Sequence, residues 1–267
     1  MKVFLKIILI VISMAAFAAL IAFLAERLEE IRGKDGKFRH KPYGIYERFF
    51  KRPLDCFLST GALIVLSPVM VILTVLGAVY MKGNPFFTQD RPGRIDPITG
   101  KSRIFKLIKF RSMTNEKDEN GNLLPDDQRL PKYGKLLRAS SLDELGELFN
   151  IIKGDMAVVG PRPLLVKYID HYNAHDMRRH EVRPGLTGLA QVSGRNSLSW
   201  GEKFRKDVEY VDNLSFSMDL RVILMTVQKV FKRDGIEFVK GHQPVMDYFN
   251  EQKQKQDETA SFDSSAD

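Results

Sequence analysis

Two adjacent carboxylates, Asp143 and Glu144, are the side chains in this sequence best suited to chemistry on a phosphorylated substrate. They lie in the segment SLDELGELFNII, whose apolar residues recur at helical spacing from Ser141 onward. The apolar side chains expected on one face of that helix are Leu142, Leu145, Leu148, Phe149 and Ile152. Acidic residues in a first helical turn are stabilised by the helix dipole, and Ser141 with Glu144 also fits a capping box. Taken alone, the pair is therefore better explained as a helix start than as catalytic groups.

Arginines in stiff or glycine-rich turns could bind the phosphates of such a substrate. Arg162 lies between two prolines in GPRP (160–163), and the segment VRPGLTGLAQVSGRN (182–196) carries Arg183 and Arg195. Backbone amides in glycine-rich loops can approach phosphates closely, and the arginine fork matches phosphate oxygens. Tight turns need glycine for conformational reasons alone, so the pattern permits both interpretations.

A metal site is a third possibility, because His171 and His175 are spaced i, i+4 in a segment with helical character. The glutamate of the zinc-protease pattern is missing, since Tyr172 stands in its place. We therefore do not favour a zinc site at this pair.

The elements that must position these residues belong to a mainly helical α+β domain over residues 82–249. The segment RIFKLIKFRSM (103–113) alternates basic and apolar residues, which predicts a strand with one core face and one cationic face. Residues 200–232 predict an amphipathic helical region that packs on the core in preference to the membrane. The polar tail, 250–267, is expected to be disordered.

The charge balance favours anionic partners. The 267 residues include 41 Lys and Arg against 33 Asp and Glu, a formal net charge of +8. Much of the basic excess flanks hydrophobic segments, where lipid phosphates are a nearer explanation than nucleic acid. The single cysteine, Cys56, excludes an intrachain disulfide and fits a reducing compartment.

The first hydrophobic segment covers residues 3–25 and is long enough for a transmembrane helix, so residues 1–26 are interpreted as a membrane anchor. A cleaved signal peptide is the alternative, because AFA (16–18) resembles a cleavage site, but the apolar run continues beyond it. Nine basic residues between Arg27 and Arg52 place the linker 27–52 in the cytoplasm and the N-terminus outside.

The second hydrophobic segment, residues 56–80, has basic residues on both flanks. One straight span cannot keep both ends in the cytoplasm. Pro68 removes a backbone donor, and Ser67 offers a hydroxyl to the freed carbonyl, so a bend at this pair is physically reasonable. We therefore predict a re-entrant membrane helix over 53–81 that is broken at Ser67-Pro68; a kinked spanning helix is the alternative.

Several motifs follow one another between Ile45 and Phe238: FFKRPLD, LSPVM, FFTQDRPG, FKLIKFRSM, GKLLRASSLDELGELFNIIKGDMAVVGPRPLL, VRPGLTGLAQVSGRN and LRVILMTVQKVFKR. In this order they resemble the small monotopic phosphoglycosyl transferases of the bacterial sugar transferase family, typified by the bacillosamine-phosphate transferase of N-linked glycosylation. The family's re-entrant helix breaks at a Ser-Pro that matches Ser67-Pro68. The resemblance therefore supports a hairpin in the membrane, with the N-terminal anchor as an addition.

The resemblance implies transfer of a sugar 1-phosphate from a UDP-sugar to polyprenyl (undecaprenyl) phosphate, with release of UMP. Asp143 would attack the phosphate nearer the sugar and form an aspartyl phosphosugar intermediate, and Glu144 would help to hold Mg2+. Where the family commonly has Lys-Thr, this chain has Arg111-Ser112. The residues expected to bind substrate phosphate are Lys109, Arg111, Arg138, Arg162, Arg183 and Arg195.

In cellular terms, the resemblance implies the initiating step of glycoconjugate synthesis at the cytoplasmic face of the bacterial inner membrane. The alternative is a non-catalytic membrane scaffold for glycan enzymes, with the acidic pair as a helix cap. The expected partners are the UDP-sugar, polyprenyl phosphate and membrane lipid, and no nucleic acid. The transferred sugar, the pathway and a homo-oligomer are left open by the sequence.

Overall fold

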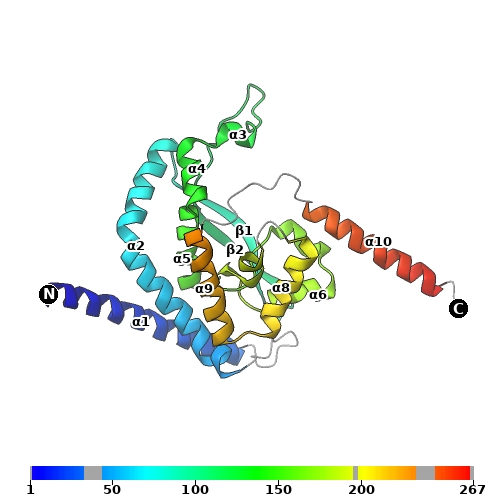
Figure 1. Cartoon of the computed structure of the whole chain (residues 1–267), viewed down its shortest axis with the longest axis horizontal. Helices are drawn as coiled ribbons and strands as arrows, with labels where there is room; N and C mark the ends of the chain where they lie inside the picture. The colour runs from blue at the N-terminus through cyan, green and yellow to red at the C-terminus, as the bar shows by residue number, and fades with distance from the viewer. Residues whose placement is uncertain (1, 33–43, 195–197, 233–243, 265–267) are drawn as a thin grey trace.

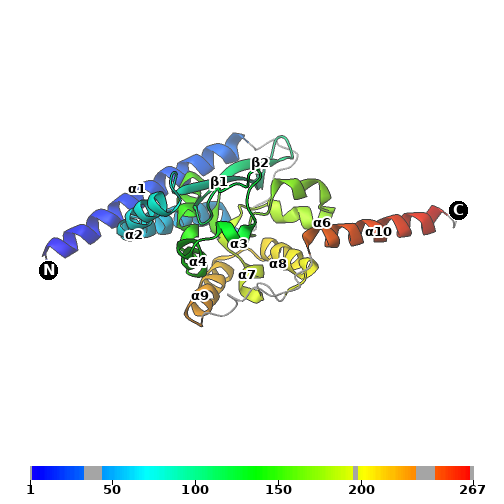
Figure 2. The same cartoon turned by 90° about the horizontal axis from the view of Figure 1, so that it is seen from above.

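The computed structural model of the chain describes residues 2–32, 44–194, 198–232 and 244–264. Within these residues helices predominate, and two small sheets complete a mainly helical α+β fold, as predicted (Figures 1 and 2). The elements are α1 (Lys2–Arg32), η1 (Tyr46–Lys51), α2 (Arg52–Tyr80), β1 (Phe86–Ile95), β2 (Ser102–Phe110), α3 (Asp126–Arg129), α4 (Lys132–Ala139), η2 (Leu142–Gly146), α5 (Glu147–Lys153), β3 (Ala157–Val159), η3 (Val166–His171), α6 (Ala174–Met177), η4 (Arg178–His180), β4 (Gly185–Thr187), α7 (Leu189–Ser193), α8 (Trp200–Asp212), α9 (Phe216–Lys232) and α10 (Val245–Ser264).

The helices α1 and α2 are each long and apolar enough to cross a membrane. Both expose large apolar side chains, such as Phe17 and Val65. They pack against each other, and small residues allow the approach: Ala22 is buried, and the Cys56 thiol lies 3.4 Å from the Ala18 carbonyl. A soluble protein buries such surfaces, so their exposure indicates a membrane-associated chain. The helix α1 also continues past the predicted anchor boundary, to Arg32.

The helix α2 passes through Pro68 without interruption, so the predicted break is corrected to a bend. Figure 1 shows the two halves of α2 running in different directions. Proline has no N–H to donate to the carbonyl of Ile64, and the Ser67 hydroxyl donates to that carbonyl instead, at 2.7 Å. The predicted use of the Ser67 hydroxyl is thus confirmed. Helical hydrogen bonding can continue because the carbonyl freed by proline keeps a donor.

The strands β1 and β2 form an antiparallel hairpin. On β2, Phe105 and Leu107 are buried, whereas Arg103 and Lys106 are exposed. The predicted strand is therefore confirmed, but the predicted cationic face is wrong, because the period of two places Arg103 on the same face as buried Phe105 and Leu107. Buried side chains of β2 pack with those of α5, and this contact fixes the hairpin beside the segment that carries the acidic pair.

The glycines of the GPRP turn and of the 182–196 segment meet at the parallel pair β3 and β4. A Cβ on Gly185 would lie 2.1 Å from the backbone nitrogen of Gly160, and a Cβ on Gly188 would lie 2.3 Å from the Gly160 carbonyl oxygen. Close packing of two backbones therefore explains these glycines. The contact holds the turn that carries Arg162.

A buried ionic network joins the start of α2 to this same sheet. Lys51 Nζ lies 2.6 Å from Asp219 Oδ2 and donates to the Val159 carbonyl at 3.1 Å. Asp55 accepts a hydrogen bond from the backbone N–H of Val158 at 3.1 Å. The bent helix and the strand before Arg162 are thereby held in one position.

The C-terminal helices divide between core and surface. On α8, Phe204, Val208 and Val211 are buried, as predicted for packing on the core. The disorder expected for residues 250–267 is wrong for 250–264, because these residues continue α10. Phe249 packs against Phe204 and fixes the start of α10 on the core. The many Gln, Lys and Glu residues of α10 have high helix propensity.

Candidate active site

The acidic pair lies on η2, a short 3-10 helix, and not in the first turn of an α-helix. Ser141 precedes it with φ of 55° and makes no side-chain capping hydrogen bond. The expected capping box is therefore wrong, because a left-handed residue does not point its hydroxyl into the helix. A non-glycine residue in this conformation is strained, and such strain clusters at functional sites.

The 3-10 helix rests directly on β2. A Cβ on Gly146 would lie 2.7 Å from the carbonyl oxygen of Ile108, so only glycine allows the contact. This approach brings the acidic pair beside Lys109, the next residue of the strand. Gly146, which weakened the helix prediction, is thus explained by its packing.

Two cations converge on Glu144. Lys109 Nζ lies 2.9 Å from Glu144 Oε1, and Arg162 Nη2 lies 2.5 Å from the same oxygen. Burial raises the pKa of Glu144, but Arg162 and Lys109 outweigh it and lower the pKa to about 2. Glu144 is therefore ionised throughout the physiological range.

Asp143 has a different electrostatic environment. Burial raises its pKa above the ordinary value, and the charge of Glu144 adds to this effect, while Lys109 and Arg138 oppose it. The two neighbouring carboxylates thus have pKa values shifted in opposite directions, as happens when two acids take different roles in one site.

Glu147 was missed by the sequence interpretation. Its side chain is almost fully buried, and its Oε1 lies 3.0 Å from Lys109 Nζ.

The predicted apolar face is wrong at Phe149, which is 42% exposed. The chain changes from a 3-10 helix to an α-helix at Glu147, and this change rotates the buried face of the helix away from Phe149. The helix instead buries Glu147 and Ile151.

The Arg111-Ser112 pair follows β2. Ser112 Oγ accepts a hydrogen bond from Arg138 Nε at 2.9 Å, and the charge of Arg138 acts on Asp143. Serine thus supplies the hydroxyl that fixes this arginine. Arg111 Nε is buried and has no hydrogen-bond partner among the described residues, so the side chain keeps a donor for a ligand.

A pocket of about 360 Å³ opens beside Glu144. The amide of Gln191 is oriented there, because its Nε2 donates to the Leu186 carbonyl at 3.3 Å. Its Oε1 is buried and unpaired among the described residues, so it can accept a hydrogen bond from a ligand. Sequence reasoning missed this role, since it read the surrounding segment only for its arginines and glycines. The pocket is lined by Ser141, Glu144, Arg162, Leu164, Arg179, Ala190, Gln191, Trp200, Lys203, Phe204 and Asp207.

Of the predicted phosphate-binding set, Arg162 lines this pocket, and Arg183 makes contacts elsewhere. Arg183 donates to the Gly154 carbonyl at 2.8 Å and lies 2.5 Å from Glu26 on α1, so it is corrected to a residue of the α1 contact. Arg195 lies outside the described residues. The structure therefore brings Lys109, Arg138 and Arg162 to the acidic pair.

The histidine pair does not form a metal site. His171 ends η3 and stacks on Phe249, whereas His175 lies on α6, so the two do not share one helix face. Among the residues with defined positions, no group of three His, Cys, Asp or Glu side chains is arranged to hold a metal.

Magnesium needs less from the protein, because it is commonly held by one or two carboxylates together with substrate phosphates and water. Both cationic partners of Glu144 contact its Oε1. Among the described residues these hydrogen bonds leave Oε2 available as an oxygen ligand. The site fits a magnesium ion that also binds the substrate.

Comparison with known proteins shows which family the chain resembles. The sequence model described as bacterial sugar transferase matches residues 46–233. An uncharacterized sugar transferase of Bacillus subtilis (strain 168), EpsL, is 48% identical over 189 residues, which cover 70% of this chain and 90% of EpsL. The UDP-glucose:undecaprenyl-phosphate glucose-1-phosphate transferase of Klebsiella pneumoniae is 37% identical over 219 residues, which cover 78% of this chain and 46% of that protein.

A further relative, the undecaprenyl-phosphate galactose phosphotransferase of Salmonella typhimurium, is 35% identical over 210 residues, which cover 70% of this chain and 42% of that protein. The chain thus spans most of EpsL but less than half of the two relatives with named reactions. Because the family match covers most of the chain and includes every residue of the acidic site, the chain belongs to the bacterial sugar transferase family.

Proposed function

We propose that this chain transfers a sugar 1-phosphate from a UDP-sugar to polyprenyl phosphate and releases UMP. The observation that carries the proposal is the acidic pair, held with Lys109 and Arg162 beside a pocket in a chain with two exposed apolar helices. The reactions named for the Klebsiella and Salmonella relatives support the same chemistry. The product would initiate synthesis of a glycoconjugate, such as a capsule, exopolysaccharide, O-antigen or glycoprotein glycan.

The proposed mechanism has two displacements at one phosphorus. A carboxylate oxygen of Asp143 bonds to the phosphorus nearer the sugar, and the bond to the bridging oxygen breaks, so UMP leaves with the bonding electrons. The polyprenyl phosphate oxygen then bonds to the same phosphorus and releases Asp143. In the first step the negative charge of Asp143 passes to the departing UMP, and in the second step the attack of polyprenyl phosphate releases Asp143 as a carboxylate again, so no external oxidant or reductant is required.

The cations serve to neutralise the diphosphate. Lys109 and Arg162 are already beside the acidic pair, and Arg138 is fixed by Ser112 with its charge acting on Asp143. Such charges stabilise the phosphoryl transition state and favour ionised Asp143. Bound Mg2+, held by Glu144 Oε2 and by substrate phosphates, would add further neutralisation.

The UDP-sugar occupies the pocket beside Glu144 in this proposal. Trp200 offers an aromatic wall that can stack on a base or a sugar, and Gln191 Oε1 accepts a hydrogen bond from the bound donor. Arg162 lies at the end next to the acidic pair, where the diphosphate must be for attack.

The membrane arrangement follows from the two apolar helices. The N-terminal part of α1 and the bend of α2 extend away from the sheets on the same side of the molecule (Figures 1 and 2). We propose that α1 spans the bacterial inner membrane and that α2 enters and leaves by its cytoplasmic face. The reacting phosphorus would then lie near the head group of the polyprenyl phosphate.

The decisive experiment measures UMP release from a panel of UDP-sugars with undecaprenyl phosphate and Mg2+. The wild-type chain should release UMP with at least one sugar, and Asp143→Asn, which keeps the shape of the side chain, should abolish release. Asp90→Asn changes an exposed carboxylate of β1 and should leave release unchanged. Wild-type activity in the Asp143 variant would reject the transferase mechanism and favour the scaffold alternative.

A further inference from the structure

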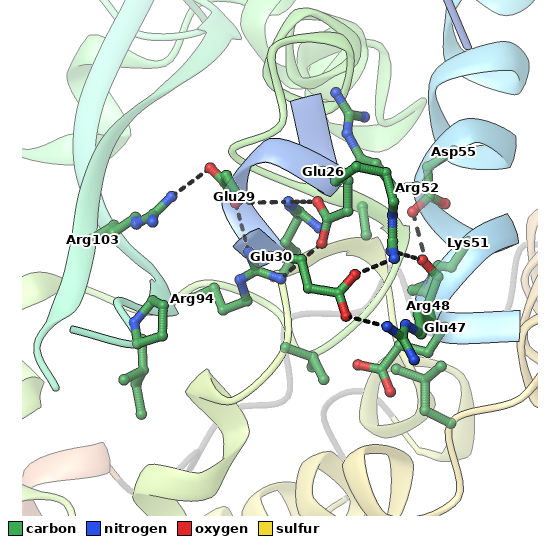
Figure 3. A pocket seen from close by; sticks show the side chains of 17 residues that line it. Glu26, Glu29, Glu30, Glu47, Arg48, Lys51, Arg52, Asp55, Arg94 and Arg103 are labelled. Carbon is green, nitrogen blue, oxygen red and sulfur yellow. Dashed lines mark hydrogen bonds and ion pairs between the residues drawn. The ribbon is translucent and has the colours of Figure 1, made fainter. Parts of the chain in front are cut away.

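The last turns of α1 carry glutamates that enter a cluster of arginines (Figure 3). Glu26 lies 2.5 Å from Arg183 and 3.2 Å from Arg94. Glu29 lies 2.8 Å from Arg94 and 2.8 Å from Arg103. Two carboxylates of one helix therefore bind three arginines from β1, β2 and the segment before β4.

The ion pairs of Glu26 are shielded from water, whereas the Glu29–Arg103 pair is partly exposed. The side chains of Glu26 and Arg183 are only 16% and 15% exposed. Pairs of this kind differ from exposed surface pairs, because removal of one partner leaves the other charge buried without compensation. The helix α1 also packs along α2. Two separate sets of contacts, the ion pairs and this helix packing, therefore hold α1 to the rest of the chain.

The arginine cluster is directly connected to the proposed active site. Arg103 lies near the start of β2, and Lys109 lies near the end of the same strand. Arg183 is followed by the β4 strand, where the backbone N–H of Gly185 donates to the Pro161 carbonyl at 3.0 Å. Pro161 precedes Arg162. The strand β2, which α1 binds through Arg103, thus includes Lys109. The segment that α1 binds through Arg183 holds the turn of Arg162 in place. Lys109 and Arg162 are the two cations that contact Glu144.

The helix α1 lies outside the residues that match the family, yet its partners Arg94, Arg103 and Arg183 lie within them. A simple tether would need no such contacts with the catalytic domain. We propose that Glu26 and Glu29 lock α1 onto the catalytic domain and so hold the active site at a fixed depth and tilt toward the bilayer.

This inference rests on the proposed function, because its consequence concerns the lipid-linked acceptor. The UDP-sugar reaches the site from water, so its reaction with Asp143 does not depend on the position of the bilayer. The polyprenyl phosphate is confined to the bilayer, and a domain that rocks on a loose helix meets its head group less often in the correct geometry. The lock therefore matters for the second displacement.

The test uses the full chain in phospholipid vesicles and compares wild type with Glu26→Gln/Glu29→Gln. A single-turnover assay without acceptor reports UMP release, and steady-state turnover reports the KM for undecaprenyl phosphate. We expect UMP release to change less than about twofold and the acceptor KM to rise roughly tenfold. Glu30→Gln is the matched control, since Glu30 pairs with Arg27 and Arg48 outside the β-hairpin. An unchanged acceptor KM, or equal losses in both assays, would overturn the inference.

Two further variants keep the proposal testable if the first pair of substitutions disturbs folding. The exchange Glu26→Arg/Arg183→Glu restores the ion pair with reversed charges and should recover more acceptor turnover than either single change. Independently of activity, Glu29→Cys with Arg103→Cys in a Cys56→Ser background should be crosslinked by a short bifunctional thiol reagent, which spans the gap that the two long side chains fill in the wild type. Failure of that crosslink overturns the docking. A crosslinked chain that releases no UMP with any UDP-sugar would instead support the docking and reject the proposed function.

Discussion

Lys109 Nζ lies 2.9 Å from Glu144 Oε1, so a strand residue neutralises one of the two acids that define the site. The same nitrogen lies 3.0 Å from Oε1 of buried Glu147. One ammonium therefore contacts two carboxylates, and the arrangement depends on the close approach of Gly146 to Ile108. A cation in this position can also act on the phosphates of a substrate that approaches Asp143.

Replacement of Lys109 should damage catalysis strongly. Lys109→Met leaves Glu147 buried without its cation and removes a charge that stabilises the transition state, so UMP release should fall about 10²–10³-fold. The control is Lys106→Met on the same strand, because Lys106 is exposed and forms an ion pair with exposed Asp90, at 3.4 Å. Equal losses in the two variants would contradict the role of Lys109.

The stability that Glu144 contributes should depend on pH in a defined direction. Its pKa is lowered from 4.5 to about 2 by the two cations, so the folded state binds the proton less tightly than the unfolded state. The contribution is complete above pH 4.5 and is lost as pH falls toward 2. Glu144→Gln should therefore lower the free energy of unfolding by up to roughly 3 kcal/mol at pH 7. Urea unfolding in detergent micelles should show that difference shrinking below pH 4.5, and a difference that stays constant down to pH 2 would contradict the assignment.

Gln191 should affect donor binding. Gln191→Leu keeps a similar volume but removes the buried acceptor, and loss of one hydrogen bond should raise the KM for the UDP-sugar roughly tenfold. Inhibition by UMP measured alongside tells whether the contact is to the nucleotide or to the sugar. Gln228→Leu, on the exposed surface of α9, is the control and should match wild type. A normal KM for every UDP-sugar in the Gln191 variant would exclude a donor contact.

The proposed topology predicts a labelling pattern. Single cysteines at Arg39 and Lys101 should be shielded from an impermeant thiol reagent added outside, because both flanks of α2 face the cytoplasm. A cysteine at Lys2 should react, because the N-terminus lies on the other side of α1. Lys101 is exposed between β1 and β2, so permeabilised cells should label it and verify its accessibility. Labelling of Lys101 from outside intact cells would instead mean that α2 spans the membrane.

Local patterns were sufficient for several features. The apolar lengths of α1 and α2, the hydroxyl of Ser67 beside Pro68, and the existence of the strand β2 were all predicted because each depends on near neighbours in the chain. The order of the motifs likewise identified the family, which the comparison bears out. Asp143 and Glu144 could be named as candidates by the same reasoning.

The sequence by itself thus determined which segments are apolar, which is bent and which carries the acidic pair. Only the tertiary structure decided that Glu147 is buried against Lys109, that Arg183 binds Glu26 rather than the pocket, and that Gln191 presents an unpaired oxygen. These outcomes depend on residues far apart in the chain; Arg183 and Glu26 are separated by 157 positions. The protonation and the partner of a charged side chain are set by burial and by nearby charges, and both exist only once the segments pack together.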